Sequence, residues 1–394
     1  MNNHYELVIL GGGCAGLSLS MRLAEHGNLA PNTLILEKRA EYLNDRTWCF
    51  WDEGEPALKD WADHAWQRFV IKNGVEQFSK SCKDHVYKML SAETFYKRAT
   101  TAISANAKRI NLLKNQTIIG VTKTPDQTWC ITTNDTIYTA TKVVDTRPVS
   151  GIQDADSILW QSFLGDEIET STNVFDVSEF VLMDFDVTFT DGLGFVYVLP
   201  YAANRALIEY TVFSSQLMTA ERLRVCLDLA LQAYVKGSNF KVIRTEQGQL
   251  PMGNTHVKHS NDPSYIHAGL FAGAARPSSG YAFQRIQSWA TQCAEAIIRQ
   301  QPLVATQKDT IFLATMDGIF LNVLKSNPSA SISLFFGFFL NCKTATIIRF
   351  LSDHATLLDH LAIIACMPKR LFLKELPRYF SKRLRSFKLN QTLK

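Results

Sequence analysis

The sequence predicts a mixed α/β protein in which a Rossmann-type dinucleotide-binding domain carries an inserted antiparallel sheet and is followed by a helical C-terminal region. Three observations support this: a glycine-rich β-α-β unit at the N-terminus, short alternating strands in mid-chain, and apolar helical segments after about residue 300. We expect the dinucleotide-binding domain over 1–150 plus about 262–300, a sheet-rich substrate domain over 151–261, and helices over 301–394.

The N-terminal unit carries a fingerprint for binding a pyrophosphate. An apolar strand, 7–10, runs into Gly11, Gly13 and Gly16, which form G-x-G-x-x-G at the start of an amphipathic helix. The glycines allow a tight turn and close approach of the backbone, and the helix N-terminus presents free N–H groups to an anion. A second strand ends in Glu37, 21 residues after Gly16, where a carboxylate can accept hydrogen bonds from a ribose.

The spacing of this fingerprint does not decide between FAD and NAD. In flavoproteins of the glutathione-reductase type, an arginine shortly after the acidic residue often faces the flavin nucleotide. Arg39 and Arg46 are both candidates for that contact.

The middle of the chain alternates in the manner of neighbouring antiparallel strands, over 180–189, 194–201 and 205–213, and a helix follows over 218–235. A strand at 265–268 then leads into a second glycine-rich turn and a long helix. This return predicts a second set of backbone N–H groups facing the same cofactor, with the inserted sheet covering its reactive ring.

Composition sets limits on the class of protein. The chain has 394 residues, of which 46% are apolar and 20% charged, and its 24 Phe, 12 Tyr and 7 Trp suit either an apolar substrate or an aromatic core. The eight cysteines form no CxxC pair and no secretory leader follows Met1, so we expect reduced thiols in a cytosolic protein, with no disulfide framework and no metal site. No apolar stretch reaches the length of about 18 residues that spans a bilayer.

The positive charge is concentrated at the C-terminus. The net charge is +4, but residues 367–394 contribute +8 and the remainder −4. Large apolar residues alternate with the basic ones, a pattern that fits an anionic bilayer surface, a solvated tail or a nucleic-acid contact.

The chain resembles bacterial lycopene β-cyclases, a family of FAD-dependent carotenoid enzymes, over nearly its whole length. The order and spacing of the shared segments match as well as their residues. They are "LVILGGGCAGLSLS", "NDRTWCFW", "VVDTRP", "WQSFLGDEIE", "LMDFDV", "GFVYVLP", "RALIEYTVFS", "EQGQLPMG", "AGAARPSSGYAFQRIQ", "MDGIFLNVL" and "IIRFLSD".

The resemblance implies proton-initiated, non-redox closure of the linear ends of lycopene to β-ionone rings, by way of γ-carotene to β-carotene. FAD would be required in its reduced form, with NAD(P)H as the reductant. Because lycopene lies in the bilayer, the resemblance also favours peripheral attachment to the cytoplasmic side of a membrane over a nucleic-acid partner. A flavin oxidoreductase acting on an apolar substrate and a non-catalytic carotenoid-binding flavoprotein remain as alternatives.

For the catalytic acid, the resemblance points to "LIEYT". Related plant enzymes carry Phe-Leu-Glu-Glu-Thr there, so Glu209 and Thr211 are kept and Tyr210 replaces the second acid. On an alternating strand, Glu209 would face away from Tyr210. The alternative is that Glu209 is an exposed strand residue paired with Arg205.

Two further carboxylates and one histidine are weaker candidates. Asp184 and Glu246 are each either a second acid or a structural hydrogen-bond acceptor, and His267 is expected in the core or beside the flavin.

The second glycine-rich turn resembles the second flavin-contacting loop of related flavoproteins. Many of those have Gly-Asp where this chain has Gly273-Ala274, so the ribityl contact of that Asp is missing. We expect an electropositive turn that places its backbone near the isoalloxazine of reduced FAD. The residues concerned are Arg276, Pro277, Ser278 and Gly280.

Overall fold

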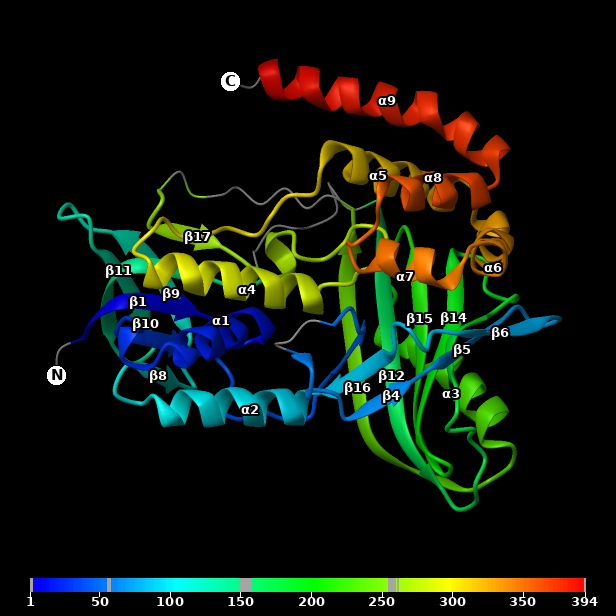
Figure 1. The fold of residues 1–394 in the computed structure, drawn as a ribbon, viewed down its shortest axis with the longest axis horizontal. Helices are drawn as coiled ribbons and strands as arrows, with labels where there is room; N and C mark the ends of the chain where they lie inside the picture. The colour runs from blue at the N-terminus through cyan, green and yellow to red at the C-terminus, as the bar shows by residue number, and fades with distance from the viewer. Residues whose placement is uncertain (1–2, 55–57, 149–157, 254–259, 261, 393–394) are drawn as a thin grey trace.

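The computed structural model describes residues 3–54, 58–148, 158–253, 260 and 262–392, with side chains up to residue 381, and has the mixed α/β architecture that the sequence predicts (Figure 1). Its helices are α1 (Cys14–Glu25), η1 (Gly27–Leu29), α2 (Ala92–Ala105), α3 (Ala220–Val235), η3 (Leu270–Ala272), α4 (Phe283–Ile298), α5 (Ile311–Ser326), η4 (Pro328–Ala330), α6 (Ser331–Asn341), α7 (Thr344–Leu351), α8 (Leu357–Cys366) and α9 (Lys369–Thr392).

The first sheet contains the N-terminal β-α-β unit. In spatial order it consists of β8 (Ile110–Leu113), β2 (Thr33–Leu36), β1 (His4–Leu10), β11 (Ile137–Asp145), β10 (Trp129–Thr133) and β9 (Ile118–Lys123), with β17 (Tyr265–His267) also beside β11. The strands β8, β2, β1, β11 and β17 pair in parallel. The chain therefore does return to its first domain after residue 262, as predicted, and α4 packs on α1.

The second sheet is antiparallel apart from one parallel pair. Its order is β16 (Phe240–Met252), β12 (Leu159–Thr170), β15 (Arg205–Ser214), β14 (Leu193–Ala202), β13 (Phe180–Phe185), β5 (Arg68–Lys72) and β6 (Gln77–Ser81). Because β5 and β6 belong to this sheet, the boundary expected at residue 150 does not separate the two sheets. A small sheet of β3 (Thr47–Trp51), β7 (Tyr87–Ser91) and β4 (His64–Trp66) accompanies them.

The two faces of the second sheet are covered by different parts of the chain. Tyr210 and Ile208 belong to one cluster with the buried side of α3. Leu207 and Phe213 point the opposite way, into a larger cluster with the small sheet and the C-terminal helices. We call the second of these the inner face. The alternation along β15 therefore directs Glu209 to the inner face, together with Leu207.

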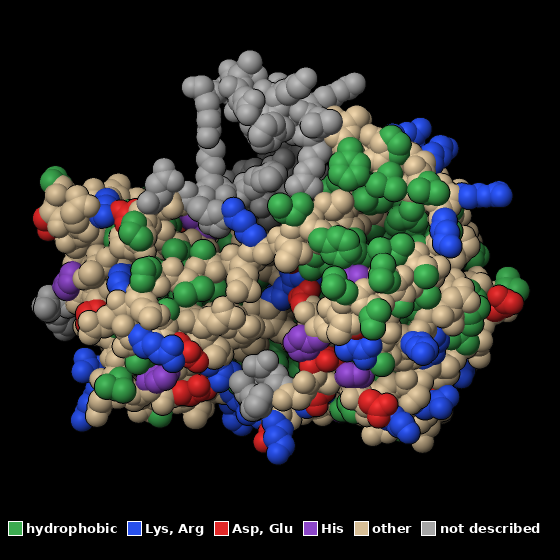
Figure 2. Space-filling view, turned by 45° about the horizontal axis from the view of Figure 1, so that its top comes forward, with side chains coloured by type: hydrophobic (Ala, Val, Ile, Leu, Met, Phe, Trp, Pro, Cys, Tyr) green, Lys and Arg blue, Asp and Glu red, His purple; other side chains and the backbone are tan. Residues whose placement is uncertain are grey.

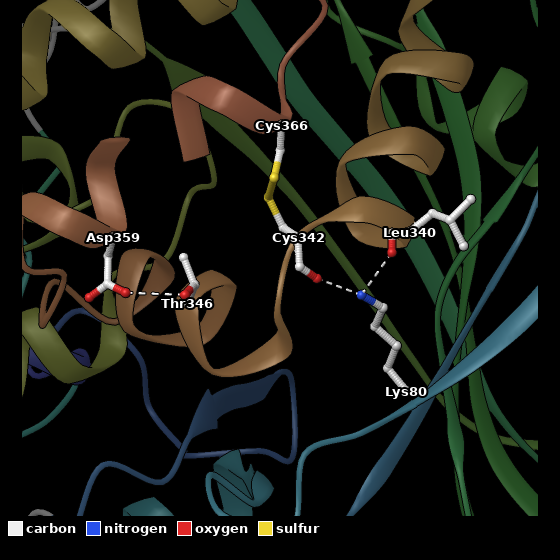
Figure 3. Close-up of a disulfide and its surroundings, with 6 residues drawn as sticks. All are labelled: Lys80, Leu340, Cys342, Thr346, Asp359 and Cys366. Atoms are coloured by element: carbon white, nitrogen blue, oxygen red, sulfur yellow. Dashed lines mark hydrogen bonds between the residues drawn. A yellow bond between two sulfur atoms is a disulfide. The ribbon is translucent and has the colours of Figure 1, made fainter. Parts of the chain in front are cut away.

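The C-terminal helices hold a disulfide that corrects the expectation of reduced thiols. Cys342, after α6, is joined to Cys366, the last residue of α8 (Figure 3). Their separation in sequence, 24 residues, gives no spacing signal. Lys80 of β6 donates hydrogen bonds to the backbone oxygens of Leu340 (3.2 Å) and Cys342 (2.6 Å), so the second sheet satisfies the carbonyl end of α6. The other six cysteines are free.

Among the described helices, none is by itself both long and apolar enough to cross a bilayer. The segments Pro328–Asn341 and Thr344–Leu351 meet the criteria of length and composition only as a pair, and the chain bends by 117° between them.

Candidate active site

The first glycine-rich turn leaves the N-terminus of α1 open. Gly13 is the N-cap of this helix, and no side chain caps it. A Cβ atom on Gly16 would overlap the carbonyl oxygen of Gly11, so only glycine permits this approach of helix and turn. An uncapped helix N-terminus with a bare backbone in front of it has the form of a pyrophosphate site.

Glu37 lies at the end of β2, beside this turn. Its Oε2 accepts a hydrogen bond from the backbone N–H of Gly12 (2.6 Å), and its Oε1 accepts from Nε of Arg39 (2.9 Å). Burial acts to raise the pKa of Glu37, but the bonds from Arg39 and Gly12 outweigh it and lower this pKa. The carboxylate is thus held ionised, as a ribose acceptor should be. Arg46 instead pairs with Asp45 at the surface (2.7 Å), so Arg39 is the arginine nearer the fingerprint.

The second glycine-rich turn lies directly against the first. Gly269 has a φ of +90°, and a Cβ atom there would lie 3.0 Å from Cβ of Ala15 in α1. At the other end of the turn Gly280 has a φ of +72°, and its Cβ would lie 2.7 Å from Oε1 of Gln161 on β12. This loop therefore connects the pyrophosphate site to the second sheet, with Gly273 (φ +92°) between the two ends.

The Arg276 side chain does not contribute a free positive charge to this turn. It is 1% exposed, its guanidinium pairs with Asp317 of α5 (3.3 Å), and it donates to the backbone oxygen of Phe350 in α7. Asp353 lies 3.6 Å away and adds a second negative charge. The expected electropositive turn is therefore neutralised by acidic side chains, and the backbone contacts expected of Pro277, Ser278 and Gly280 remain predictions.

Glu209 occupies the inner face of the second sheet, opposite Tyr210. Tyr210 donates to Asp186 (2.7 Å) on the α3 side, as the alternation predicted. Arg205 donates to Glu167 (2.7 Å) and not to Glu209, so the alternative of an exposed Glu209–Arg205 pair is wrong. The hydroxyl of Thr211 donates to Oε1 of Glu209 (2.8 Å).

A second carboxylate, Glu246, lies beside Glu209. In the strand register, Gly165 of β12 is paired with Glu209 of β15 on one side and with Glu246 of β16 on the other. Because residue 165 has no side chain, β12 places none between the two carboxylates. A Cβ there would lie 3.0 Å from Cβ of Glu209.

Glu246 is anchored by a cation and a hydroxyl group. It pairs with Arg244, and its Oε2 accepts from the hydroxyl of Thr47 on β3 (2.7 Å). Arg244 also pairs with Glu167 (2.6 Å). Arg205 continues this row of ion pairs to the first residue of β15, where its side chain is half exposed.

The pKa values of the two carboxylates follow from this arrangement. Burial, followed by the negative charge of Glu246, raises the pKa of Glu209 to about 8. Burial also raises the pKa of Glu246, but the charge and hydrogen bond of Arg244 and the hydroxyl of Thr47 oppose it. A proton shared by the pair is therefore held on Glu209 at neutral pH.

Further polar but uncharged side chains come from β3, from β14 and from the residue after Gly280. Cys49, Tyr197, Tyr201 and Tyr281 each keep some accessible surface, although burial raises the pKa of all four. Among the described residues, the Tyr201 hydroxyl and Oε1 of Gln161 have no hydrogen-bond partner, so each is available to a bound molecule.

Asp184 is not part of this group. It accepts a hydrogen bond from Tyr234 of α3 (2.7 Å) and lies 3.7 Å from Lys72. Simple alternation would place Asp184 with Phe180 and Leu182 on the inner face, but a bulge between Val181 and Asp184 turns it to the α3 face. A catalytic role for Asp184 thus remains a prediction that its position does not favour.

His267 lies on β17 beside Asp145, with 3.9 Å between Nδ1 and Oδ2. It belongs to the first sheet and its side chain is partly exposed, so the expected core or flavin-adjacent position remains a prediction. Thr47 and Cys49 were missed as site residues, although both lie in the segment "NDRTWCFW". Their signal in the sequence is a Thr-x-Cys alternation that directs both side chains to one face of β3.

A family model described as lycopene cyclase protein matches residues 6–376. The chain belongs to the lycopene cyclase family. Its curated relatives include a lycopene beta-cyclase from Pantoea ananas, 24% identical over 71% of this chain and 72% of the relative, and one from Pseudescherichia vulneris, 24% identical over 70% of each. A lycopene beta-cyclase from a Paracoccus strain is 32% identical over 35% of each chain.

This lycopene cyclase family member shares its fold with flavoproteins. A geranylgeranyl bacteriochlorophyll reductase-like protein from Thermoplasma acidophilum superimposes with a TM-score of 0.61 at 16% identity, covering 95% of this chain and 99% of that one. A p-nitrophenol 4-monooxygenase from Pseudomonas putida gives 0.58 at 14% identity over 95% and 98%. A variant of the halogenase PltM in complex with FAD gives 0.56 at 10% identity over 94% and 85%. The predicted fold class is confirmed.

Proposed function

We propose that this enzyme is a lycopene β-cyclase in which Glu209 is the general acid. The observation that carries the proposal is a carboxyl group with no salt bridge among the described residues, beside a second, cation-paired carboxylate, both on the inner face of a sheet, in a chain of the lycopene cyclase family. An alkene is a weak base, so its protonation requires an acid that is both undissociated and shielded from water.

The reaction proceeds without net oxidation. The proton of Glu209 is added to the terminal double bond of the linear end and leaves a tertiary carbocation. The neighbouring double bond attacks that cation and forms the six-membered ring, and a ring proton is then lost to a carboxylate. Substrate and product are isomers, so we assign the enzyme to the intramolecular lyase or isomerase class.

We place FAD across the two glycine-rich turns. The uncapped α1 N-terminus fits its pyrophosphate, Glu37 fits its ribose, and Oε1 of Gln161 offers an acceptor where the second turn reaches β12. Reduced FAD would supply an electron-rich ring that stabilises positive charge at the substrate's linear end. Gln161, the proposed flavin contact, and Gly165, at the carboxylate pair, are about four residues apart on β12. This corresponds to roughly 13 Å along the strand at the rise of a β-strand. We propose NAD(P)H as the reductant of the flavin.

The decisive variant is Glu209→Gln, which retains shape but cannot donate the acidic proton. We expect formation of β-carotene from lycopene to fall at least about 100-fold, since general acid catalysis contributes that much or more. FAD content, measured by absorbance of the purified protein, should be unchanged. Glu169→Gln is the matched control, because Glu169 lies on the same sheet but pairs with Lys241 at its edge.

Two results would overturn this function. One is a wild-type protein that leaves lycopene unchanged in the presence of reduced FAD. The other is NAD(P)H consumption in proportion to product, which would indicate an oxidoreductase, whereas a cyclase needs reductant only to prime the flavin.

We further propose peripheral attachment to an anionic membrane through a surface that we call the apolar face. It is made by exposed side chains of α8 and by the first residues of α5: Leu357, Leu358, Leu361, Ile364, Ile311 and Phe312. Phe312 contacts His360 of α8, with 5.3 Å between ring centres, so the two helices present one surface. Figure 2 shows hydrophobic side chains gathered over this region with Lys and Arg along its margin.

A further inference from the structure

We propose that Glu246 is a positioning residue whose fixed negative charge keeps the catalytic proton on Glu209. The inference rests on the proposed function, because it assigns a role to a second residue of the same site. Three geometric facts carry it: the register that brings both carboxylates to Gly165, the absence of a side chain at that position, and the unequal surroundings of the two groups.

The register makes the pairing a property of the sheet. Glu209, Gly165 and Glu246 are direct cross-strand partners on three adjacent strands, so the flanking side chains leave the same face at the same height. Any residue larger than glycine at position 165 would occupy the space between the two carboxylates.

The surroundings decide which carboxylate carries the proton. Glu246 has the cation of Arg244 and the hydroxyl of Thr47, both of which favour its ionised form. Among the described residues, no cation forms a salt bridge with Glu209, whose Oε1 accepts a hydrogen bond from the hydroxyl of Thr211. Ionising both of two carboxylates in contact costs free energy, because their like charges repel. The carboxylate without a counter-charge therefore remains protonated.

The other titratable and charged groups near this pair do not change the assignment. Burial keeps the thiol of Cys49 and the hydroxyls of Tyr197 and Tyr201 neutral by raising their pKa values. The charge of Glu167 is shared between two arginines. The groups come from the neighbouring strands: Cys49 from β3, Glu167 from β12, Tyr197 and Tyr201 from β14, and Arg244 and Glu246 from β16.

The test is the pH dependence of cyclisation by the FAD-loaded enzyme with lycopene in liposomes. In wild type, activity should fall as pH rises and Glu209 loses its proton. In Glu246→Gln the like charge is gone, so this alkaline limb should move to lower pH by about one unit or more. In Thr47→Val, which removes a donor that stabilises the ionised pair, the limb should move to higher pH by about half a unit.

The matched control is Asp166→Asn. Asp166 is also a buried carboxylate on β12, paired with Arg224 and bound by the hydroxyl of Thr245 (2.7 Å), but it lies on the α3 face. Its variant should keep the wild-type profile. FAD content and melting temperature identify any variant that fails to fold, and Thr47→Val retains every charge.

An alkaline limb that stays in place in Glu246→Gln, or that moves downward in Thr47→Val, overturns the inference. So does a limb that moves equally in Asp166→Asn. Failure of the proposed function looks different: wild type then forms no β-carotene, or Glu209→Gln is as active as wild type.

Discussion

Gly165 shows how much of the site depends on a missing side chain. We predict that Gly165→Ala reduces cyclisation about tenfold or more, because the new Cβ would lie 3.0 Å from Cβ of Glu209 and 3.2 Å from Cδ1 of Leu207. Overpacking of this kind costs about 1–3 kcal/mol in the free energy of unfolding. Carotenoid analysis and chemical denaturation measure the two effects.

Gly120→Ala is the control for that variant. Gly120 is also a strand glycine, on β9, and a Cβ there meets nothing within 4 Å. It should leave both quantities unchanged. If Gly165→Ala also retains full activity and stability, the two carboxylates do not need the space above residue 165.

Individual residues also show what the sequence could and could not predict. Glu209 was found because a family motif and strand alternation both point to it. Glu246 was named, but its partner in space depends on a register between β12 and β16 that no local pattern encodes. Asp184 was named as a candidate acid from its segment alone, and the bulge in β13 that turns its side chain to the α3 face has no local signal in the sequence.

At the scale of elements, the C-terminal helices anchor the second glycine-rich turn through the side chain of Arg276, which pairs with Asp317 of α5. We predict that Arg276→Met lowers the free energy of unfolding by about 3–5 kcal/mol, because it leaves the buried carboxylate of Asp317 without its cation. The double variant Arg276→Met/Asp317→Leu should recover most of this loss, since apolar residues of similar size can replace a buried ion pair.

FAD content of the same variants separates two roles of the arginine. If Arg276 only fixes the loop, the double variant should bind FAD as the wild type does. A double variant that is stable yet lacks FAD would instead support the expectation from the sequence that the positive charge of Arg276 helps to bind the flavin. Thermal denaturation and flavin absorbance give both answers from one preparation.

At the scale of the molecule, the sequence predicted the fold class and the return of the chain to its first sheet, since both follow from local strand and helix patterns. It did not predict that β5 and β6 join the second sheet, because that pairing joins segments about 100 residues apart. It also did not predict the Cys342–Cys366 disulfide, since only the packing of α6 and α8 brings the two thiols together.

The position of the apolar face leads to a prediction about the whole molecule. From the sequence, the basic tail was the candidate for the membrane contact. Its side chains beyond residue 381 lie outside the described part. The exposed leucines instead belong to α8: Leu357 is 79% exposed, Leu358 77% and Leu361 62%. The helix is oriented by a capping box at Thr356 and by Asp359, which turns inward and pairs with Arg349 (3.0 Å). Its apolar side is therefore fixed outward.

We predict that changing Leu357, Leu358 and Leu361 together to Gln reduces flotation with anionic liposomes about tenfold or more, since each buried leucine contributes about 1.5–3 kcal/mol. The control changes Val225 and Leu229 of α3 to Gln. These two are similarly exposed (61% and 64%) but belong to α3, which covers the opposite face of the second sheet from the C-terminal helices (Figure 1). Cyclisation of lycopene in liposomes should fall with flotation in the α8 variant and be retained in the α3 variant. Equal flotation of the two variants would contradict a membrane contact through α8. Any loss of flotation would then depend on the number of exposed apolar side chains and not on the position of this face.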